Sequence, residues 1–160
     1  MTPQDHGYRI GLVKGRGLVS RLISREIRDD KTHGYLLCPQ RLTVREVVES
    51  VAGPGMRVRE WDPAETKTAD FYDVGGRTLA QWQSVERLMR EWVAMGVKYD
   101  YPGILSWRAK LPMSVNGKLF CTEALELADQ MAGDPLFRCA PHYISPRDFD
   151  INLRLIPRLP

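Results

Sequence analysis

Cys121 has the setting in this sequence that most favours chemistry. It lies in the segment Asn-Gly-Lys-Leu-Phe-Cys-Thr-Glu-Ala-Leu, at or near the start of a helix predicted over residues 119–131. At a helix N-terminus the backbone N–H groups and the helix dipole favour a thiolate, the nucleophilic form of cysteine. The same N–H groups can hydrogen-bond a developing oxyanion. The position predicts that Cys121 is a nucleophile. The alternative is that Cys121 is a core residue, because free cysteine is often buried.

His33 is the preferred partner of this cysteine. A cysteine nucleophile needs an imidazole within hydrogen-bond reach, and a further group that orients the imidazole. His33 lies where the polar loop of residues 29–32 enters an apolar segment predicted as a strand, which would fix its side chain at the end of an element. The other two histidines, His6 and His142, lie in a terminal segment and in a loop bounded by proline.

Residues 43–51 decide whether Glu49 can orient His33. A capping box at the start of this segment and the spacing of its valines fit a helix, whereas valine itself favours a strand. We prefer a strand, because the Gly-Pro-Gly of residues 53–55 would then join it as a hairpin to an alternating strand at 56–61. In that strand Glu49 shares a face with its valine neighbours two residues away on each side.

The remaining periodic segments mix helices and strands. Strands are predicted at residues 8–13 and 35–38, with a possible last strand at 148–156, and helices at residues 18–27 and 78–93. We expect this pattern to form one α+β domain over residues 1–160, since a chain of this length can bury a core of its own.

Composition limits the classes of partner. The chain has 160 residues, and its 23 Lys and Arg against 20 Asp and Glu give a formal net charge of +3, too weak to indicate a nucleic-acid partner. No apolar run approaches the roughly 18 residues of a membrane span. The first residues lack the pattern of a secretory signal, so a cytoplasmic protein is expected.

Two further patterns allow other chemistry. The three cysteines are too few and odd for a disulfide framework, but Cys139 and His142 have ligand-like spacing, and Cys38, His33 or Cys121 could complete a metal site. The Lys-Gly-Arg-Gly of residues 14–17 precedes a helix and could hold an anion, although it lacks the spacing of a P-loop. We favour neither, and expect no metal and no cofactor.

Four short motifs occur in an unusual order. They are Thr32-His33-Gly34-Tyr35, Val48-Glu49-Ser50, Phe120-Cys121-Thr122-Glu123 and Ser145-Pro146-Arg147-Asp148. This order resembles the circularly permuted NlpC/P60 papain-like cysteine hydrolases, specifically the YiiX/YebB-like branch. In unpermuted papain-like enzymes the cysteine precedes the histidine, whereas here His33 comes first. The chain departs from the family pattern at Ser50, where alanine is expected, and in the order His33-Gly34-Tyr35.

The resemblance implies an α+β fold in which a small antiparallel sheet or barrel packs on the nucleophile helix. It implies Cys121 as the nucleophile, His33 as general base and then acid, and Glu49, with Glu46 as the alternative, as the group that holds the imidazole tautomer. Tyr99 and Asp100 would line or brace the cleft. Substrate specificity is expected in the loops at residues 62–70 and 108–115.

The implied activity is hydrolysis of an amide or ester through an acyl-enzyme, with a peptide or acyl-amide substrate that includes peptidoglycan-type peptides. A cell-wall substrate would require delivery without a signal peptide. Two alternatives remain open: an acyltransferase that uses the same site, and an inactive ligand-binding or structural module of a larger assembly. The sequence gives no indication of oligomeric state.

Overall fold

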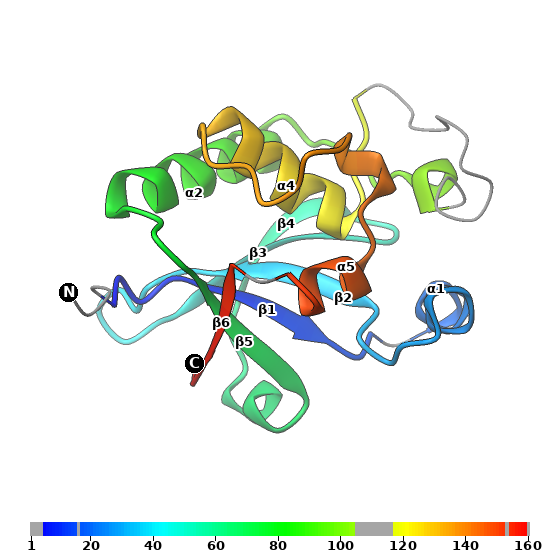
Figure 1. Ribbon diagram of the computed structural model, residues 1–160, viewed down its shortest axis with the longest axis horizontal. Helices are drawn as coiled ribbons and strands as arrows, with labels where there is room; N and C mark the ends of the chain where they lie inside the picture. The colour runs from blue at the N-terminus through cyan, green and yellow to red at the C-terminus, as the bar shows by residue number, and fades with distance from the viewer. Residues whose placement is uncertain (1–4, 16, 105–116, 153, 160) are drawn as a thin grey trace.

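A single open sheet forms the centre of the molecule. The computed structural model describes residues 5–15, 17–104, 117–152 and 154–159. Within them the chain has an α+β architecture with a six-stranded antiparallel sheet in the order β4-β3-β2-β1-β5-β6 (Figure 1). The sheet ends at β4 and at β6, so it is not the closed barrel that the sequence allowed as an alternative.

The described residues contain six strands, four helices and two 3-10 turns. The strands are β1 (Arg9–Val13), β2 (His33–Leu37), β3 (Glu46–Val51), β4 (Gly55–Glu60), β5 (Ala69–Val74) and β6 (Leu155–Arg158). The helices are α1 (Leu18–Ile27), α2 (Leu79–Ala94), α4 (Cys121–Met131) and α5 (Pro146–Asp150), with the 3-10 turns η1 (Pro63–Lys67) and η2 (Pro141–Tyr143).

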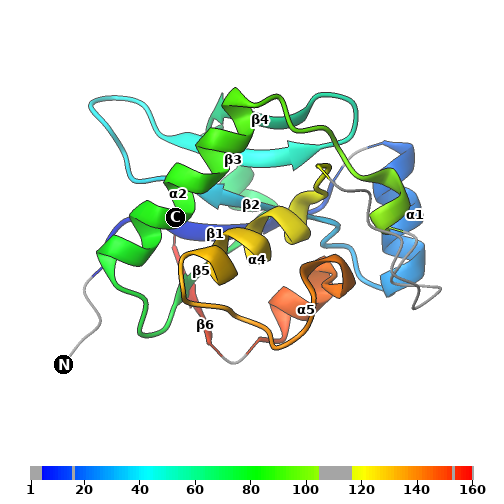
Figure 2. The same ribbon diagram turned by 90° about the horizontal axis from the view of Figure 1, so that it is seen from above.

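Helices α2 and α4 pack together across one face of the sheet (Figure 2). Because side chains alternate along a strand, successive residues enter different cores. Leu36 and Val48 join Trp82 of α2 and Leu125 of α4 in the larger core. The alternate positions of the strands belong to a smaller cluster, which consists of Tyr35, Leu37, Val47, Ala69 and Phe71. The central strands β2 and β3 are therefore buried on both faces, which explains the consecutive apolar residues Tyr35-Leu36-Leu37 and Val47-Val48.

The two predictions on which the site depends are confirmed. β3 and β4 form a hairpin whose register runs from Glu46 opposite Glu60 to Val51 opposite Gly55. The predicted nucleophile helix is α4, although it begins at Cys121 and not at residue 119. Tertiary pairing with β2 and β4 thus decides the ambiguous segment at residues 43–51 in favour of the strand.

Two parts of the sequence prediction are wrong. Residues 148–156 were predicted as one strand, but Pro146–Asp150 form α5 and β6 begins only at Leu155. Asp148 explains the helix, because its Oδ2 accepts hydrogen bonds from Ser145 N at 2.7 Å and from Ser145 Oγ at 2.6 Å as a helix cap. Strand β5 was not predicted, since the segment was read as a loop up to residue 70; it lies between β1 and β6.

None of the helices in the described ranges is long and apolar enough to cross a membrane.

Candidate active site

The N-terminus of α4 packs closely against the start of β2. Gly34 makes this possible, because a Cβ on it would lie 3.2 Å from Leu125 Cδ1 and 3.4 Å from Thr122 Cγ2. A larger residue at position 34 would push the helix away from the strand. The lack of a side chain thus brings Cys121, the first residue of α4, next to His33, the first residue of β2.

A divergence of two strands makes room for the cysteine. β2 and β3 pair through Leu36 with Val48 and Leu37 with Val47, and this ladder does not extend to the start of β2. The N–H of Gly34 instead hydrogen-bonds the sulfur of Cys121, as does the N–H of Thr122. The site therefore lies where the sheet opens.

His33 connects Cys121 with Glu49. Its Nε2 lies 2.7 Å from Glu49 Oε2, and its ring also hydrogen-bonds the Cys121 side chain. Because Nε2 faces Glu49, Nδ1 is the nitrogen that remains for the thiol. The three side chains form one hydrogen-bonded series from two strands and a helix.

The electrostatics of Cys121 and His33 favour a thiolate beside an imidazolium. Burial favours the neutral form of His33, but the hydrogen bonds and negative charges of Cys121 and Glu49 outweigh it and raise the pKa of His33 from 6.5 to about 9. Burial also opposes ionisation of Cys121, yet His33 and the N–H groups of Gly34 and Thr122 together lower the pKa of the thiol. At neutral pH His33 is therefore protonated.

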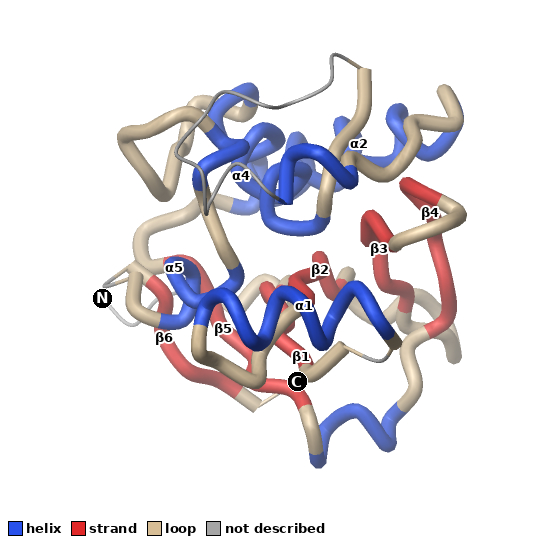
Figure 3. Tube along the Cα trace, turned by 90° about the vertical axis from the view of Figure 1, so that its right-hand side faces the viewer, coloured by secondary structure: helices blue, strands red, loops and turns tan. Residues whose placement is uncertain are grey.

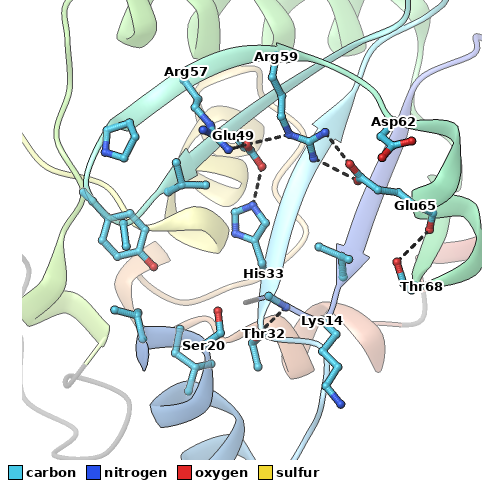
Figure 4. Close-up of a pocket in the computed structure, with 18 residues that line it drawn as sticks. Lys14, Ser20, Thr32, His33, Glu49, Arg57, Arg59, Asp62, Glu65 and Thr68 are labelled. Carbon is cyan, nitrogen blue, oxygen red and sulfur yellow. Dashed lines mark hydrogen bonds and ion pairs between the residues drawn. The ribbon is translucent and has the colours of Figure 1, made fainter. Parts of the chain in front are cut away.

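Two arginines hold the buried carboxylate of Glu49. Arg57 Nε and Nη2 donate to Glu49 Oε1 at 2.9 and 2.7 Å, and Arg59 Nε donates to the same oxygen at 3.0 Å. Oε2 is left for His33, as Figure 4 shows. Burial alone would raise the pKa of Glu49, but His33 and the arginines lower it to about 2. Glu49 thus remains charged and fixed in orientation.

A cavity of about 740 Å³ opens beside His33. Its wall comes from the end of β1, from α1, from the β3–β4 hairpin and from the segment around η1. Figure 3 shows how the backbone of α1 and of the hairpin is arranged. His33, Glu49 and Tyr99 all line it. Cys121 does not line it and is 1% exposed. Tyr99, which also packs in one cluster with Cys121 and Phe120, joins the cavity to the cysteine.

The other predicted site residues lie in different places. Asp100 is fully buried, accepts a hydrogen bond from Gly103 N at 3.1 Å, and does not line the cavity. Glu46, the alternative carboxylate, bonds Arg90 Nη2 at 2.5 Å and does not meet His33. Of the two loops predicted for specificity, residues 62–70 supply Asp62, Glu65 and Thr68 to the cavity. The loop at 108–115 lies outside the described residues.

The residues of the metal alternative are dispersed. Cys38 is buried, and burial together with the nearby Glu86 raises its pKa to about 12. Cys139 is exposed. Throughout the part of the chain that the structure describes, no group of three or more His, Cys, Asp or Glu side chains is arranged to hold a metal ion.

Sequence reasoning missed the role of Arg57, Arg59 and Ser50. Arg57 stands directly opposite Glu49 in the hairpin and Arg59 shares its face, so the register would have indicated them. Ser50 appeared only as a departure from the family pattern. Its buried Oγ donates to the carbonyl oxygen of Leu119 at 2.6 Å and ties β3 to the segment just before Cys121.

Comparison with solved structures gives the fold class. No known family model matches the sequence, and no curated protein matches it. The chain is similar in structure to the metalloprotein YiiX of Escherichia coli O157:H7, a protein with the DUF1105 family label, whose crystal structure it matches with a TM-score of 0.68. The match covers 96% of each chain at 16% sequence identity. The fold is therefore YiiX-like.

Proposed function

We propose that this protein is a cysteine-dependent hydrolase that cleaves an amide or ester of a peptide or acyl-amide substrate. The hydrogen-bonded series Cys121, His33 and Glu49 carries the proposal. A thiol, a base and a fixed carboxylate in this order are the parts that nucleophilic catalysis needs. Two further observations support it. The fold is YiiX-like, and the order in which His33, Glu49 and Cys121 occur along the chain follows the permuted pattern.

In this mechanism the Cys121 thiolate adds to the substrate carbonyl carbon and forms a tetrahedral intermediate. The backbone N–H groups at the start of α4 stabilise its negative charge. His33 then gives a proton to the leaving amine or alcohol, the carbon–nitrogen or carbon–oxygen bond breaks, and a thioester remains on Cys121. A water molecule loses a proton to His33, attacks the thioester and releases the acid. An amine or alcohol in place of this water would make the same site an acyltransferase.

Glu49 has a positioning role in this scheme. Its Oε2 accepts from Nε2 of His33, so Nδ1 faces the thiol in both halves of the reaction. Arg57 and Arg59 prevent the carboxylate from turning away. The description of YiiX as a metalloprotein adds no step here, because the described residues of this chain do not form a set of metal ligands.

The burial of Cys121 favours a second candidate. A thiol that is 1% exposed beside a large open cavity also fits a module that binds a ligand at His33 and Arg57 without turnover. The two candidates differ in one property, which is whether the thiol reacts.

The test is the rate of iodoacetamide labelling of each cysteine against pH, measured by peptide mass spectrometry in the wild type, in His33→Ala and in His6→Ala. The hydrolase requires Cys121 to label rapidly below about pH 7 and His33→Ala to remove this advantage. His6→Ala is the matched control, because His6 lies in the N-terminal segment and should leave the rate unchanged. Slow labelling, or labelling with an ordinary thiol pKa of about 8.5, would support the binding module instead.

A further inference from the structure

The cavity beside His33 has an excess of positive charge. Its cationic lining is Lys14, Arg57, Arg59 and the protonated His33, and its acidic lining is Glu49, Asp62 and Glu65. What matters for a ligand is which of these groups still have unused donors or acceptors.

The acidic groups are already occupied by the protein itself. Glu49 accepts from both arginines and from His33. Glu65 accepts from Arg59 at 2.6 and 3.1 Å and from the hydroxyl of Tyr35 at 2.9 Å. Asp62 caps the η1 turn by accepting from Ala64 N. A cationic ligand would have to displace these bonds.

The cationic groups are not all occupied. Arg59 uses its three nitrogens on Glu49, Glu65 and the carbonyl oxygen of Glu60. Arg57 bonds Glu49 through Nε and Nη2, and among the described residues its Nη1 has no hydrogen-bond partner. Its side chain is 44% exposed at the cavity wall. The exposed Lys14 lines the same cavity and likewise bonds none of the described side chains, but it lies on the other side of His33 and points away from Arg57 (Figure 4).

We infer that Arg57 forms an anion subsite of this cavity, and that the substrate is an amide or ester that carries a carboxylate close to the bond that is cleaved. The cleavage part rests on the proposed function; the binding part does not. Arg57 and His33 contact opposite oxygens of Glu49, which places the subsite adjacent to the imidazole. A guanidinium with an unused donor is suited to a carboxylate.

The remaining wall of the cavity fits the rest of such a molecule. Its apolar part consists of Val13, Val19, Ile23, Val51, Ala52 and Pro54, beside the polar Ser20, Thr32 and Thr68. A small acyl or amino-acid side chain can pack here while the carboxylate meets Arg57. The substrate class is thus an acylated amino acid or a peptide with a free carboxylate, and neither a cationic nor an uncharged amide.

The test compares two alkylating reagents of nearly equal size, iodoacetate, which carries a carboxylate, and iodoacetamide, which is neutral. The ratio of their rate constants at Cys121 is divided by the same ratio at the exposed Cys139 of the same molecule. This removes differences in intrinsic reactivity. We expect the normalised ratio to favour iodoacetate by about tenfold, the size of one charge-assisted hydrogen bond.

Three variants test whether Arg57 causes this preference for iodoacetate. Arg57→Gln should abolish most of it, and Arg57→Lys should retain part of it because the charge remains. Arg87→Gln is the control, since Arg87 is an exposed arginine of α2 paired with Glu91, and it should leave the ratio unchanged. Any effect of Arg57→Gln on the reactivity of the thiol itself affects both reagents and cancels in the ratio.

A binding measurement separates the two proposals. The dissociation constants of N-acetylglycine and N-acetylglycinamide are measured by NMR titration of the Cys121→Ser protein, with and without Arg57→Gln. If Cys121 resists both reagents but N-acetylglycine binds in an Arg57-dependent manner, the hydrolase is wrong and the subsite stands. If Cys121 reacts without preference for iodoacetate, or with a preference that Arg57→Gln does not change, the subsite is overturned and the hydrolase remains. Equal binding of both compounds also overturns the subsite.

Discussion

Glu49 reaches His33 with one carboxylate oxygen, 2.7 Å from Nε2, and gives its other oxygen to two arginines. Replacing it by the isosteric amide in Glu49→Gln removes the charge that raises the pKa of His33. We expect this pKa to fall and the alkylation of Cys121 at pH 6 to slow by at least about tenfold. His33 NMR titration and labelling rates measure the two effects.

Glu46→Gln is the matched control for this variant. Glu46 lies on the same strand but bonds Arg90, so the labelling rate of Cys121 should not change. Equal rates in the wild type and in Glu49→Gln would show that the carboxylate does not support the imidazolium.

The reactivity of Cys121 should have a defined dependence on pH. The lowered pKa of Cys121 makes the thiolate present above that pKa, and the raised pKa of His33 keeps the imidazolium present up to about pH 9. The ion pair therefore exists between these two limits, and turnover by the proposed hydrolase should fall on both sides. In His33→Ala a single ionisation near the usual thiol pKa of about 8.5 should remain. If the reactivity of Cys121 in the wild type also depends on pH through that single ionisation alone, the ion pair is contradicted.

Ser50→Ala should loosen the segment before Cys121. The variant leaves the buried carbonyl oxygen of Leu119 without its 2.6 Å hydrogen bond, which should lower the free energy of unfolding by about 1–3 kcal/mol in urea denaturation. Thr66→Ala, which removes an exposed local hydrogen bond to Pro63, is the control and should change stability by less than about 0.5 kcal/mol. A loss no larger than that of the control would mean that the Ser50 contact contributes nothing.

Tyr99 should limit access to the thiol. It lines the cavity and packs against Cys121, so Tyr99→Leu should raise the rate of iodoacetamide labelling at pH 8. The neighbouring Tyr101, which is 48% exposed, provides the control variant Tyr101→Leu, whose rate should stay close to that of the wild type. An unchanged rate in Tyr99→Leu would mean that reagents reach Cys121 by another route.

The sequence predicted the parts of the site that depend on local pattern. The apolar periodicity around Cys121 indicated the start of α4, and the turn at residues 53–55 indicated the hairpin that carries Glu49. Strand β5 is missed because its sequence Ala-Asp-Phe-Tyr-Asp-Val carries two aspartates, one of which, Asp70, forms an ion pair with Lys31. Its strand structure is stabilised by tertiary pairing with β1, which a local pattern does not contain.

The arrangement of charge around the site could not be predicted from the sequence pattern for a similar reason. Arg57 and Arg59 read as ordinary polar positions of an alternating strand, and only the register of the hairpin sets them against Glu49. The burial of Cys121 depends on the close contact of α4 with Gly34 and on Tyr99, which are distant in the sequence. The α5 helix, by contrast, was predictable, because Ser145, Pro146 and Asp148 form a standard helix start, although the predicted strand begins at Asp148.

The distance along the chain between His33 and Cys121 has a consequence for folding. His33 and Glu49 belong to neighbouring strands and can meet early, whereas Cys121 reaches them only after a long intervening segment has closed. Until α4 docks on β2, the thiol should have the reactivity of cysteine in an unfolded chain. The Cys121–His33 pair is thus completed only when α4 docks on β2, and pulse labelling of Cys121 during refolding would report the moment of this docking.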